Sequence, residues 1–432
     1  MKKISVVFAL FAALAVMAGG QEKQLWRKGA VHTHSLWSDG RSLPEVAVQT
    51  YKNLGYDFMC LSDHNIFQED DNVWLHVTSP LGAWPGNLTP KEYKYAQNFV
   101  PGKLTVKQVG ARTFVKLRTY KELCRMFNEE DKFVMVPGEE ITTGVTQYQT
   151  HFNVFNVEEN LNFSKGSKCK TTDEVLKKNY AVYKKAAARA PGKSFFMVNH
   201  PFWHAWDIAP RLLIDNHEIT HFEICNNTSV EPVAYALSTE KFWDLVLAHR
   251  LANGHKVIYA TATDDTHYYW PDSKPAATPD NAWVMVNVPG KLTPDNIGSA
   301  LALGDFYSSC GVTLDTLKFD GKTLTVAAKP GKGVKYHIEF IVTKKNFDRS
   351  ITLKKYEFKK SKYTRELPVI PDSIGTTALK VDGPSGSYTL KEDDLYVRAV
   401  VISDRKTKLG DKDKMFPLTQ RAWTQPFTPL SK

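Results

Sequence analysis

The chain has 432 residues, a length that exceeds a single compact core and predicts two domains. Hydrophobic residues make up 42% of the sequence and charged residues 24%, which excludes a disordered or fibrous protein. The formal net charge of +10 is compatible with anionic substrates. The sequence contains no arginine-rich arm and no nucleic-acid-binding motif, so the charge does not predict a nucleic-acid partner.

The N-terminus has the pattern of an export signal. Lys2 and Lys3 precede an apolar run over residues 4–18, and small residues follow at 18–20. The run is shorter than the roughly 20 residues that span a bilayer, so we expect a signal peptide over residues 1–20 that is cleaved rather than retained as an anchor. The sequence therefore predicts an exported bacterial protein, periplasmic or secreted, with no membrane span in its mature form.

Eight short apolar runs, rich in β-branched and aromatic residues, predict buried strands of a parallel sheet. They cover residues 29–34, 56–62, 132–138, 151–157, 194–200, 221–227, 256–263 and 282–288. Helix signals separate several of these runs, over residues 42–55, 172–190 and 239–253. This alternation of strands and helices predicts an α/β barrel or a doubly wound sheet.

Two segments depart from the alternation. Residues 66–131 form a long insertion, which we expect to act as a lid or a wall at the active face. After about residue 313, strand-like runs are separated by Gly, Lys and Asp turns without a strong helix. We therefore predict a barrel domain over residues 21–312 and a smaller all-β, sandwich-like domain over residues 313–432.

The predicted strands end in residue types that bind metal ions. These residues are His32, His34, Asp39, Asp63, His64, Glu139, Glu140, His151, His200, Asp264, Asp265 and His267. Each of them could be a helix cap, a solvated turn or a satisfied core group. Their repetition favours one shared metal site, because strand ends converge on one mouth of a barrel. Six histidines and at least three carboxylates exceed one tetrahedral site, so we expect two or three divalent ions.

The motifs HxHSxxSDG, SDHN, GxEIT, HFNVF, NHP and DxH, in this order, resemble the PHP (polymerase and histidinol phosphatase) superfamily of metal-dependent phosphoesterases over residues 28–312. The resemblance implies a distorted (β/α)7 barrel with Zn, Mn or Fe ions at its mouth. It implies three sites, held by His32, His34, Glu140 and Asp265, by Asp39, His64 and His267, and by Glu140, His151 and His200. Two positions depart from the family pattern: Gly40 stands where some members have histidine, and Asp264 could compete with Asp265 for the metal.

The resemblance also implies hydrolysis of a phosphoester, in which a hydroxide that bridges two metals attacks phosphorus. We expect His204 or Asp264 to protonate the leaving oxygen. We expect Asp63 and Glu139 to lie behind the ligands, with Asp63 orienting an imidazole.

Aromatic residues follow two of the motifs, Trp203 and Trp206 after His200 and Tyr268 and Tyr269 after His267. They either pack a lid against the rim or form a stacking wall for a substrate. The substrate expected from these patterns is a small phosphorylated molecule, with a sugar or nucleotide phosphoester as one class.

Three functions remain open from the sequence. The favoured one is an exported phosphoesterase that acts on a small phosphate monoester or diester. The same barrel could instead hydrolyse a C–N or carboxylic ester bond, and amide and lactone substrates would separate these two. The third is a non-catalytic surface or glycan-binding protein, which the apparently complete ligand set disfavours.

Overall fold

The structure is a computed structural model that describes residues 24–78, 87–145, 148–161, 169–226, 237–270, 278–358, 363–408 and 417–429. The predicted signal peptide lies outside these residues. Among the described residues, no helix combines the length and the hydropathy of a membrane-spanning segment.

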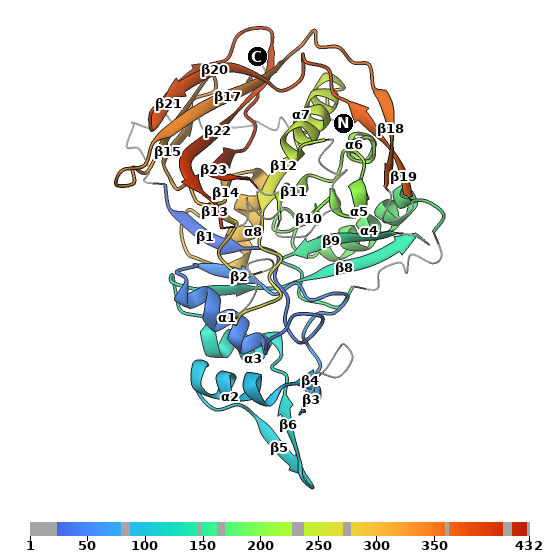
Figure 1. Ribbon diagram of the computed structural model, residues 1–432, viewed down its shortest axis with the longest axis vertical. Helices are drawn as coiled ribbons and strands as arrows, with labels where there is room; N and C mark the ends of the chain where they lie inside the picture. Colours follow the sequence, from blue (N-terminus) through green and yellow to red (C-terminus); the bar gives the residue numbers. More distant parts are fainter. Residues whose placement is uncertain are drawn as a thin grey trace, which may run out of the picture.

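The largest sheet has nine strands and extends from the N-terminal part of the chain into the C-terminal part (Figure 1). Its order is β20 (Thr376–Asp382), β17 (Tyr336–Lys344), β22 (Asp394–Lys406), β23 (Thr419–Thr424), β14 (Phe306–Ser309), β13 (Trp283–Asn287), β1 (Trp26–Ala30), β2 (Phe58–Cys60) and β7 (Val134–Val136). Strands β1, β2 and β7 are parallel, and the other neighbours are antiparallel. Strands from both sides of residue 312 therefore share this sheet, and the division predicted there stays a prediction.

A second sheet has five strands. Its order is β12 (Tyr259–Ala262), β11 (His221–Cys225), β10 (Phe195–Val198), β9 (Tyr148–Phe155) and β8 (Gly138–Val145). The chain passes from β7 in the first sheet to β8 in the second at Pro137 and Gly138. A Cβ atom at Gly138 would lie 2.4 Å from the carbonyl oxygen of Val154, so this close crossing requires glycine.

The two sheets pack face to face. Phe58 of β2 and Val136 of β7 share a buried cluster with Phe155 of β9 and Met197 of β10, and each such side chain contributes about 1.5–3 kcal/mol by burial. Two isolated β-bridges join the sheets at one end, between Thr33 and Thr266 and between His64 and Glu140. This end carries the residues that the sequence singled out.

All eight predicted strands are present, and the mixed α/β class is confirmed. The predicted (β/α)7 barrel is not confirmed, because no sheet of the described residues closes on itself. Strands β9 and β13 also run antiparallel to their neighbours, contrary to the parallel prediction. The helices beside these sheets are α1 (Pro44–Asn53), α4 (Thr172–Ala187), α5 (Trp203–Trp206), α6 (Pro210–Asp215), α7 (Thr239–Ala252) and α8 (Pro294–Leu303).

The insertion over residues 66–131 forms a small sheet and two helices, and the sheet and the first of these helices project from the body (Figure 1). Its elements are β3 (Trp74–Val77), β4 (Asn87–Leu88), α2 (Pro90–Phe99), β5 (Val106–Val109), β6 (Arg112–Lys116) and α3 (Tyr120–Phe127), with the strands in the order β4-β3-β6-β5. Leu75 and Val115 on one face of this sheet are buried in the same cluster as Ala96 of α2. The role of the insertion as a lid or wall stays a prediction.

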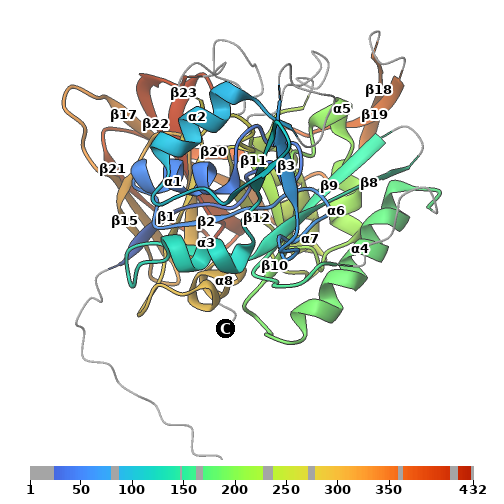
Figure 2. The ribbon, with the colours of Figure 1, turned by 90° about the horizontal axis from the view of Figure 1, so that it is seen from below.

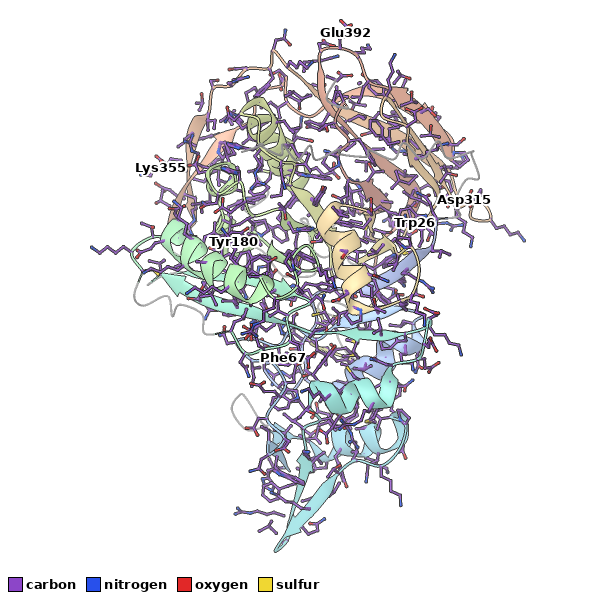
Figure 3. All side chains as sticks on the ribbon, turned by 180° about the vertical axis from the view of Figure 1, so that it is seen from behind. Trp26, Phe67, Tyr180, Asp315, Lys355 and Glu392 are labelled. Carbon is purple, nitrogen blue, oxygen red and sulfur yellow. The ribbon has the colours of Figure 1, made fainter. Side chains whose placement is uncertain are left out.

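The C-terminal part adds a second layer to the nine-stranded sheet. Its further strands are β15 (Leu314–Phe319), β16 (Thr323–Ala328) and β21 (Ser385–Thr389), which form one sheet, and β18 (Thr352–Phe358) and β19 (Tyr363–Val369), which form a hairpin. Leu324 and Val326 of β16 pack against Phe340 of β17 and Val401 of β22. The side chains drawn in Figure 3 fill the space between these layers.

Glu45 in the first turn of α1 is completely buried, with its Oε1 3.5 Å from Nε of Arg118. Burial raises the pKa of Glu45 from 4.5 to about 7. Because the carboxyl of the unfolded chain ionises at lower pH, the folded state loses stability as the pH rises through this interval. We expect Glu45→Gln to raise the free energy of unfolding at pH 8 and to change it little at pH 4, measured by urea denaturation. An equal change at both pH values would contradict this explanation.

Candidate metal centre

The predicted ligands form three overlapping groups, in each of which the ligand atoms lie within 4.8 Å of one another. The groups are His34, Asp39, His64 and His267; His32, His34 and Glu140; and His64, Glu140 and His151. Because His34, His64 and Glu140 each belong to two groups, the side chains form one continuous cluster.

The backbone explains this convergence. His32 and His34 follow β1 and flank Thr33, which bridges to Thr266, so the alternation of an extended chain turns both imidazoles to one side. His64 follows β2 and bridges to Glu140 on β8. The cluster therefore lies along the seam between the two sheets, where neither sheet supplies the ligands alone.

Glu140 is the centre of the cluster. Its Oε2 lies 3.1 Å from Nε2 of His32, 3.1 Å from Nε2 of His34 and 3.0 Å from Nδ1 of His64. Its Oε1 lies 2.9 Å from Nδ1 of His151. The Nε2 atoms of His32 and His34 are themselves 3.1 Å apart.

These atoms fit a metal better than they fit one another. Imidazoles that converge in this way direct their ring nitrogens at the same point, and the buried Nε2 of His151 has no hydrogen-bond partner among the described residues. Buried polar atoms without partners are costly. Divalent ions among the imidazole and carboxylate donors would remove that cost.

The electrostatics of the cluster also calls for positive charge. Burial opposes ionisation of Glu140, but the neighbouring His64, His32 and His151 outweigh it and hold the pKa of Glu140 well below its ordinary value. Burial likewise opposes a charged His34, but hydrogen bonds with Asp265 and Glu140 raise its pKa to about 10. The carboxylates therefore stay ionised, and either protons or metal ions must balance them.

Asp265 and His200 lie at different distances from the centre. Oδ1 of Asp265 is 3.1 Å from Nε2 of His34 and 3.3 Å from Nε2 of His32. Nε2 of His200 is farther out, 3.8 Å from Oε1 of Glu140 and 3.9 Å from Oδ2 of Asp265. In the group around His151, the third close ligand is therefore His64, where the sequence predicted His200.

One side of the cluster opens to solvent. The side chains of His32 and His34 are fully buried, whereas those of Asp39, His64 and His267 are 24%, 16% and 20% exposed. A substrate can therefore reach the cluster at Asp39, His64 and His267.

Glu223 orients one of the ligands, and the sequence patterns did not identify it as a functional residue. Its Oε1 lies 2.7 Å from Nδ1 of His32, and its Oε2 accepts a hydrogen bond of 2.7 Å from the backbone N–H of His200. With a proton held on Nδ1, His32 presents the lone pair of Nε2 to the cluster. The available signal was an acidic residue in the middle of the apolar run HFEICNN (221–227).

Replacing Glu223 should weaken metal binding without removing a ligand. We expect Glu223→Gln to lower metal affinity about 10- to 100-fold. Without the carboxylate, the proton of His32 is no longer held on Nδ1, so Nε2 is less often free to bind the metal. Competition with a chromophoric chelator measures this affinity. Glu339→Gln on β17 is the matched control, and equal affinities for both variants would contradict the role of Glu223.

Two other missed residues contact the ligands. The hydroxyl of Thr142 forms a hydrogen bond with Nδ1 of His64, and the side-chain amide of Asn199 donates to Oε1 of Glu140 over 2.7 Å. Both residues stand inside motifs quoted from the sequence, Thr142 at the end of GxEIT and Asn199 at the start of NHP, and these motifs were the available signal.

Asp264 does not have the predicted role of proton donor. Its carboxylate accepts hydrogen bonds of 2.8 Å from the backbone N–H groups of Asp280, Asn281 and Ala282, and one of 3.0 Å from the hydroxyl of Tyr51. Asp264 is buried and anchors a loop to α1, so its carboxylate is already fully engaged. The side chain of His204, the other predicted donor, lies outside the described residues.

Asp63 and Glu139 also differ from their predictions. Asp63 accepts hydrogen bonds from the backbone N–H and hydroxyl of Ser35 and from the hydroxyl of Ser38, so it orders the loop after His34 and does not itself orient an imidazole. Glu139 is buried beside Glu140 and accepts a hydrogen bond from the backbone N–H of Leu161, and burial raises its pKa to about 8. Alternation along β8 directs it away from the face that Glu140 occupies.

Two of the four residues of the predicted aromatic wall are buried in packing contacts, and the role of the other two stays a prediction. Trp206 is 1% exposed and stacks on Phe242, and Tyr269 is 4% exposed and donates a hydrogen bond to the carbonyl of His34, so both are packing residues. Trp203 lies edge-on to His151 with ring centroids 4.7 Å apart, and Tyr268 is exposed. Trp203 and Tyr268 therefore remain candidates for contact with a substrate.

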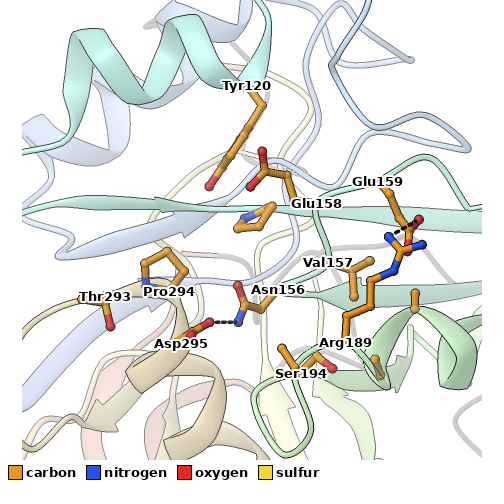
Figure 4. A pocket seen from close by; sticks show the side chains of 14 residues that line it. Tyr120, Asn156, Val157, Glu158, Glu159, Arg189, Ser194, Thr293, Pro294 and Asp295 are labelled. Carbon is orange, nitrogen blue, oxygen red and sulfur yellow. Dashed lines mark hydrogen bonds and ion pairs between the residues drawn. The ribbon is translucent and has the colours of Figure 1, made fainter.

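The pocket drawn in Figure 4 is separate from the cluster. It encloses about 570 Å³ between the end of α4 and the start of α8, and Asn156, Arg189, Ser194 and Asp295 line it. None of the candidate metal ligands lines this pocket, so it does not belong to the candidate metal centre.

Comparison with known proteins gave no matching family model and no matching curated protein. Similar solved structures include a two-domain protein from Bacteroides vulgatus that contains a predicted PHP-like metal-dependent phosphoesterase, with 13% identity, a TM-score of 0.40 and coverage of 95% of this chain and 97% of that one. Another is a proposed metal-dependent phosphoesterase from Bifidobacterium adolescentis, with 11% identity, a TM-score of 0.30 and coverage of 58% of this chain and 93% of that one. A third is an amidohydrolase from Chromobacterium violaceum with bound sulfate and no metal. It has 11% identity, a TM-score of 0.25 and coverage of 61% of this chain and 91% of that one.

The fold and the cluster together outline a candidate metal centre. The mixed α/β layers hold six histidines and three carboxylates at one seam, and this set of donors suits divalent ions.

Proposed function

We propose that the chain is a PHP-type metal-dependent phosphoesterase that is exported and hydrolyses a small phosphate monoester or diester. The observation that carries the proposal is the carboxylate of Glu140, fully buried and with imidazole nitrogens of four histidines within 3.1 Å of its oxygens. The N-terminal pattern over residues 1–20 supports export.

The residues divide into inner and outer ligands. His32, His34, Glu140 and Asp265 would hold an inner ion, and Asp39, His64 and His267 would hold an outer one. Bound divalent ions would supply charge for the phosphoryl oxygens and lower the pKa of a water molecule. Glu223 keeps a proton on Nδ1 of His32, and the ring of Trp203 lies edge-on beside His151. Imidazole donors suit Zn, Mn or Fe.

The test compares substrate classes before and after removal of metal. Chelation of the purified protein should abolish hydrolysis of generic phosphate monoesters or diesters, and addition of Zn, Mn or Fe should restore it. Panels of amides and lactones run in parallel should show no turnover. Metal-dependent turnover of amides or lactones without phosphoesters would reject the proposal in favour of C–N or carboxylic ester hydrolysis.

A further inference from the structure

The segment over residues 200–207, which follows β10, has a strained backbone beside the metal centre. His200 and Trp206 have φ angles of 22° and 69°, in the left-handed region that residues other than glycine rarely adopt. Such conformations persist where surrounding contacts hold them. Between these two residues stands Trp203, whose ring lies edge-on to those of His151 and His200, with centroids 4.7 Å and 5.2 Å apart. The place of Trp203 beside the candidate ligands therefore depends on what holds this segment at each end.

The first end of segment 200–207 is held from the five-stranded sheet. The backbone N–H of His200 donates to Oε2 of Glu223 on β11 over 2.7 Å. Two backbone hydrogen bonds connect this end to the other one. The N–H of Trp203 donates to the carbonyl of His200 over 2.8 Å, and the N–H of Asp207 donates to the carbonyl of Trp203 over 3.2 Å. A displacement of Asp207 is therefore passed to Trp203 through a single turn of backbone.

The other end is held by the hairpin of β18 and β19 in the C-terminal part. Nη2 of Arg365 on β19 donates to Oδ1 of Asp207 over 3.4 Å, across a separation of 158 residues in the chain. The side chains of Asp207 and Arg365 are only 4% and 15% exposed. Burial raises the pKa of Asp207 well above its ordinary value, and Arg365 opposes that rise. A guanidinium donates to a carboxyl oxygen in either protonation state, so the contact does not depend on the charge of Asp207.

One face of the hairpin is turned toward segment 200–207. Arg365 and Leu367 are two residues apart on β19, so their side chains share a face. Leu367 is 1% exposed and belongs to the same buried cluster as Phe202 and Trp206. In Figures 1 and 2, β18 and β19 lie beside α5. Packing at Leu367 and the polar contact at Arg365 therefore hold the hairpin against the segment together.

We propose that Arg365 is a positioning residue of the metal centre. Through Asp207 it fixes segment 200–207, and so keeps Trp203 in place beside the candidate ligands. All of these ligands lie before residue 268, so the C-terminal part completes a site to which it gives no ligand. The inference rests on the proposed function and goes beyond it, because it gives the C-terminal hairpin a task in the reaction.

Fluorine NMR follows the position of Trp203 without using turnover. The full chain, loaded with Zn²⁺ and labelled with fluorotryptophan, carries ten labelled rings, and the resonance that Trp203→Phe removes belongs to Trp203. We expect Arg365→Gln to shift or broaden this resonance and to leave that of Trp74 on β3, assigned in the same way, in place. Arg365→Lys keeps the positive charge and should cause a smaller change. A loss of stability alone would lower the midpoint of thermal unfolding without moving a resonance of the folded protein.

Hydrolysis of a generic phosphoester provides the second measurement. We expect Arg365→Gln to lower kcat/KM by up to about a hundredfold, since a displacement of about 1 Å at a reacting site can have an effect of this size. Lys355→Gln is the matched control. It removes one positive charge from the same hairpin, but Lys355 pairs with Glu366 on the exposed face, at the surface in Figure 3. The proposal requires that this control match the wild type in the Trp203 resonance and in kcat/KM.

The two readouts let the two proposals fail separately. Hydrolysis by the wild type, with an unmoved Trp203 resonance or an unchanged kcat/KM in both Arg365 variants, would overturn the positioning role alone. An Arg365→Lys variant that does not fold would also overturn it, because Arg365 would then support the whole chain. A Trp203 resonance that moves in the Arg365 variants, while the wild type hydrolyses no phosphoester, would reject the proposed function alone.

Discussion

Replacement of His34 by alanine is expected to remove most of the bound metal and to lower phosphoester hydrolysis by at least about a hundredfold. His34 belongs to two of the three ligand groups, and its Nε2 lies 3.1 Å from both Glu140 and Asp265. Its loss would therefore affect the inner and the outer ligands together.

Mass spectrometry of the metal content, on protein purified with metal in excess, measures the first effect. We expect about two to three equivalents of transition metal for the wild type. His337→Ala on β17 is the control, since His337 lies outside the three ligand groups. Less than one equivalent in the wild type would reject the metal centre, and an unchanged content in His34→Ala would reject His34 as a ligand.

Asp244→Ala is expected to lower the free energy of unfolding by about 3–5 kcal/mol. Nε of Arg398 on β22 donates to Oδ1 of Asp244 over 2.8 Å, and Nη2 donates to Oδ2 over 2.6 Å. The hydroxyl of Tyr396 also donates to Oδ1 over 2.8 Å. Both charged side chains are almost fully buried, so removal of Asp244 on α7 leaves the guanidinium without its counter-charge.

Urea denaturation provides the measurement, and Asp215→Ala provides the comparison. Asp215 pairs with Arg211 over 2.7 Å at an exposed position, and such pairs contribute about 0–1 kcal/mol. The double replacement Asp244→Leu with Arg398→Met should recover much of the stability, because it removes both charges. A loss below about 1 kcal/mol for Asp244→Ala would show that water or a rearrangement satisfies Arg398.

The sequence predicted the strands better than their arrangement. Each apolar run became a strand because β-branched and aromatic residues suit a buried sheet. The apolar run around His151, however, carries no signal of strand direction. The antiparallel pairing of β9 could therefore not be inferred from it. The transfer of the chain between sheets at Gly138 depends on a close approach to Val154, which only the folded backbone reveals.

The candidate site shows the same limit. Ligand types at strand ends identified the histidines and carboxylates that converge, because strand ends share an edge. Asp264 and Asp265 are adjacent and chemically identical, and only the hydrogen bonds to residues 280–282 distinguish the anchor from the ligand. Trp206 and Tyr269 are buried by contacts with residues distant in sequence, so their exposure could not be predicted from the motifs beside them.

The position of β23 in the nine-stranded sheet has a consequence for the order of folding. β14 pairs with β13 on one edge and with β23 on the other, and β23 ends at Thr424. During synthesis one edge of β14 therefore stays unpaired until more than a hundred further residues have been made. An unpaired strand edge can form backbone hydrogen bonds with other chains, which leads to aggregation. Chains cut short after β14 should accordingly aggregate even though every candidate metal ligand has already been made.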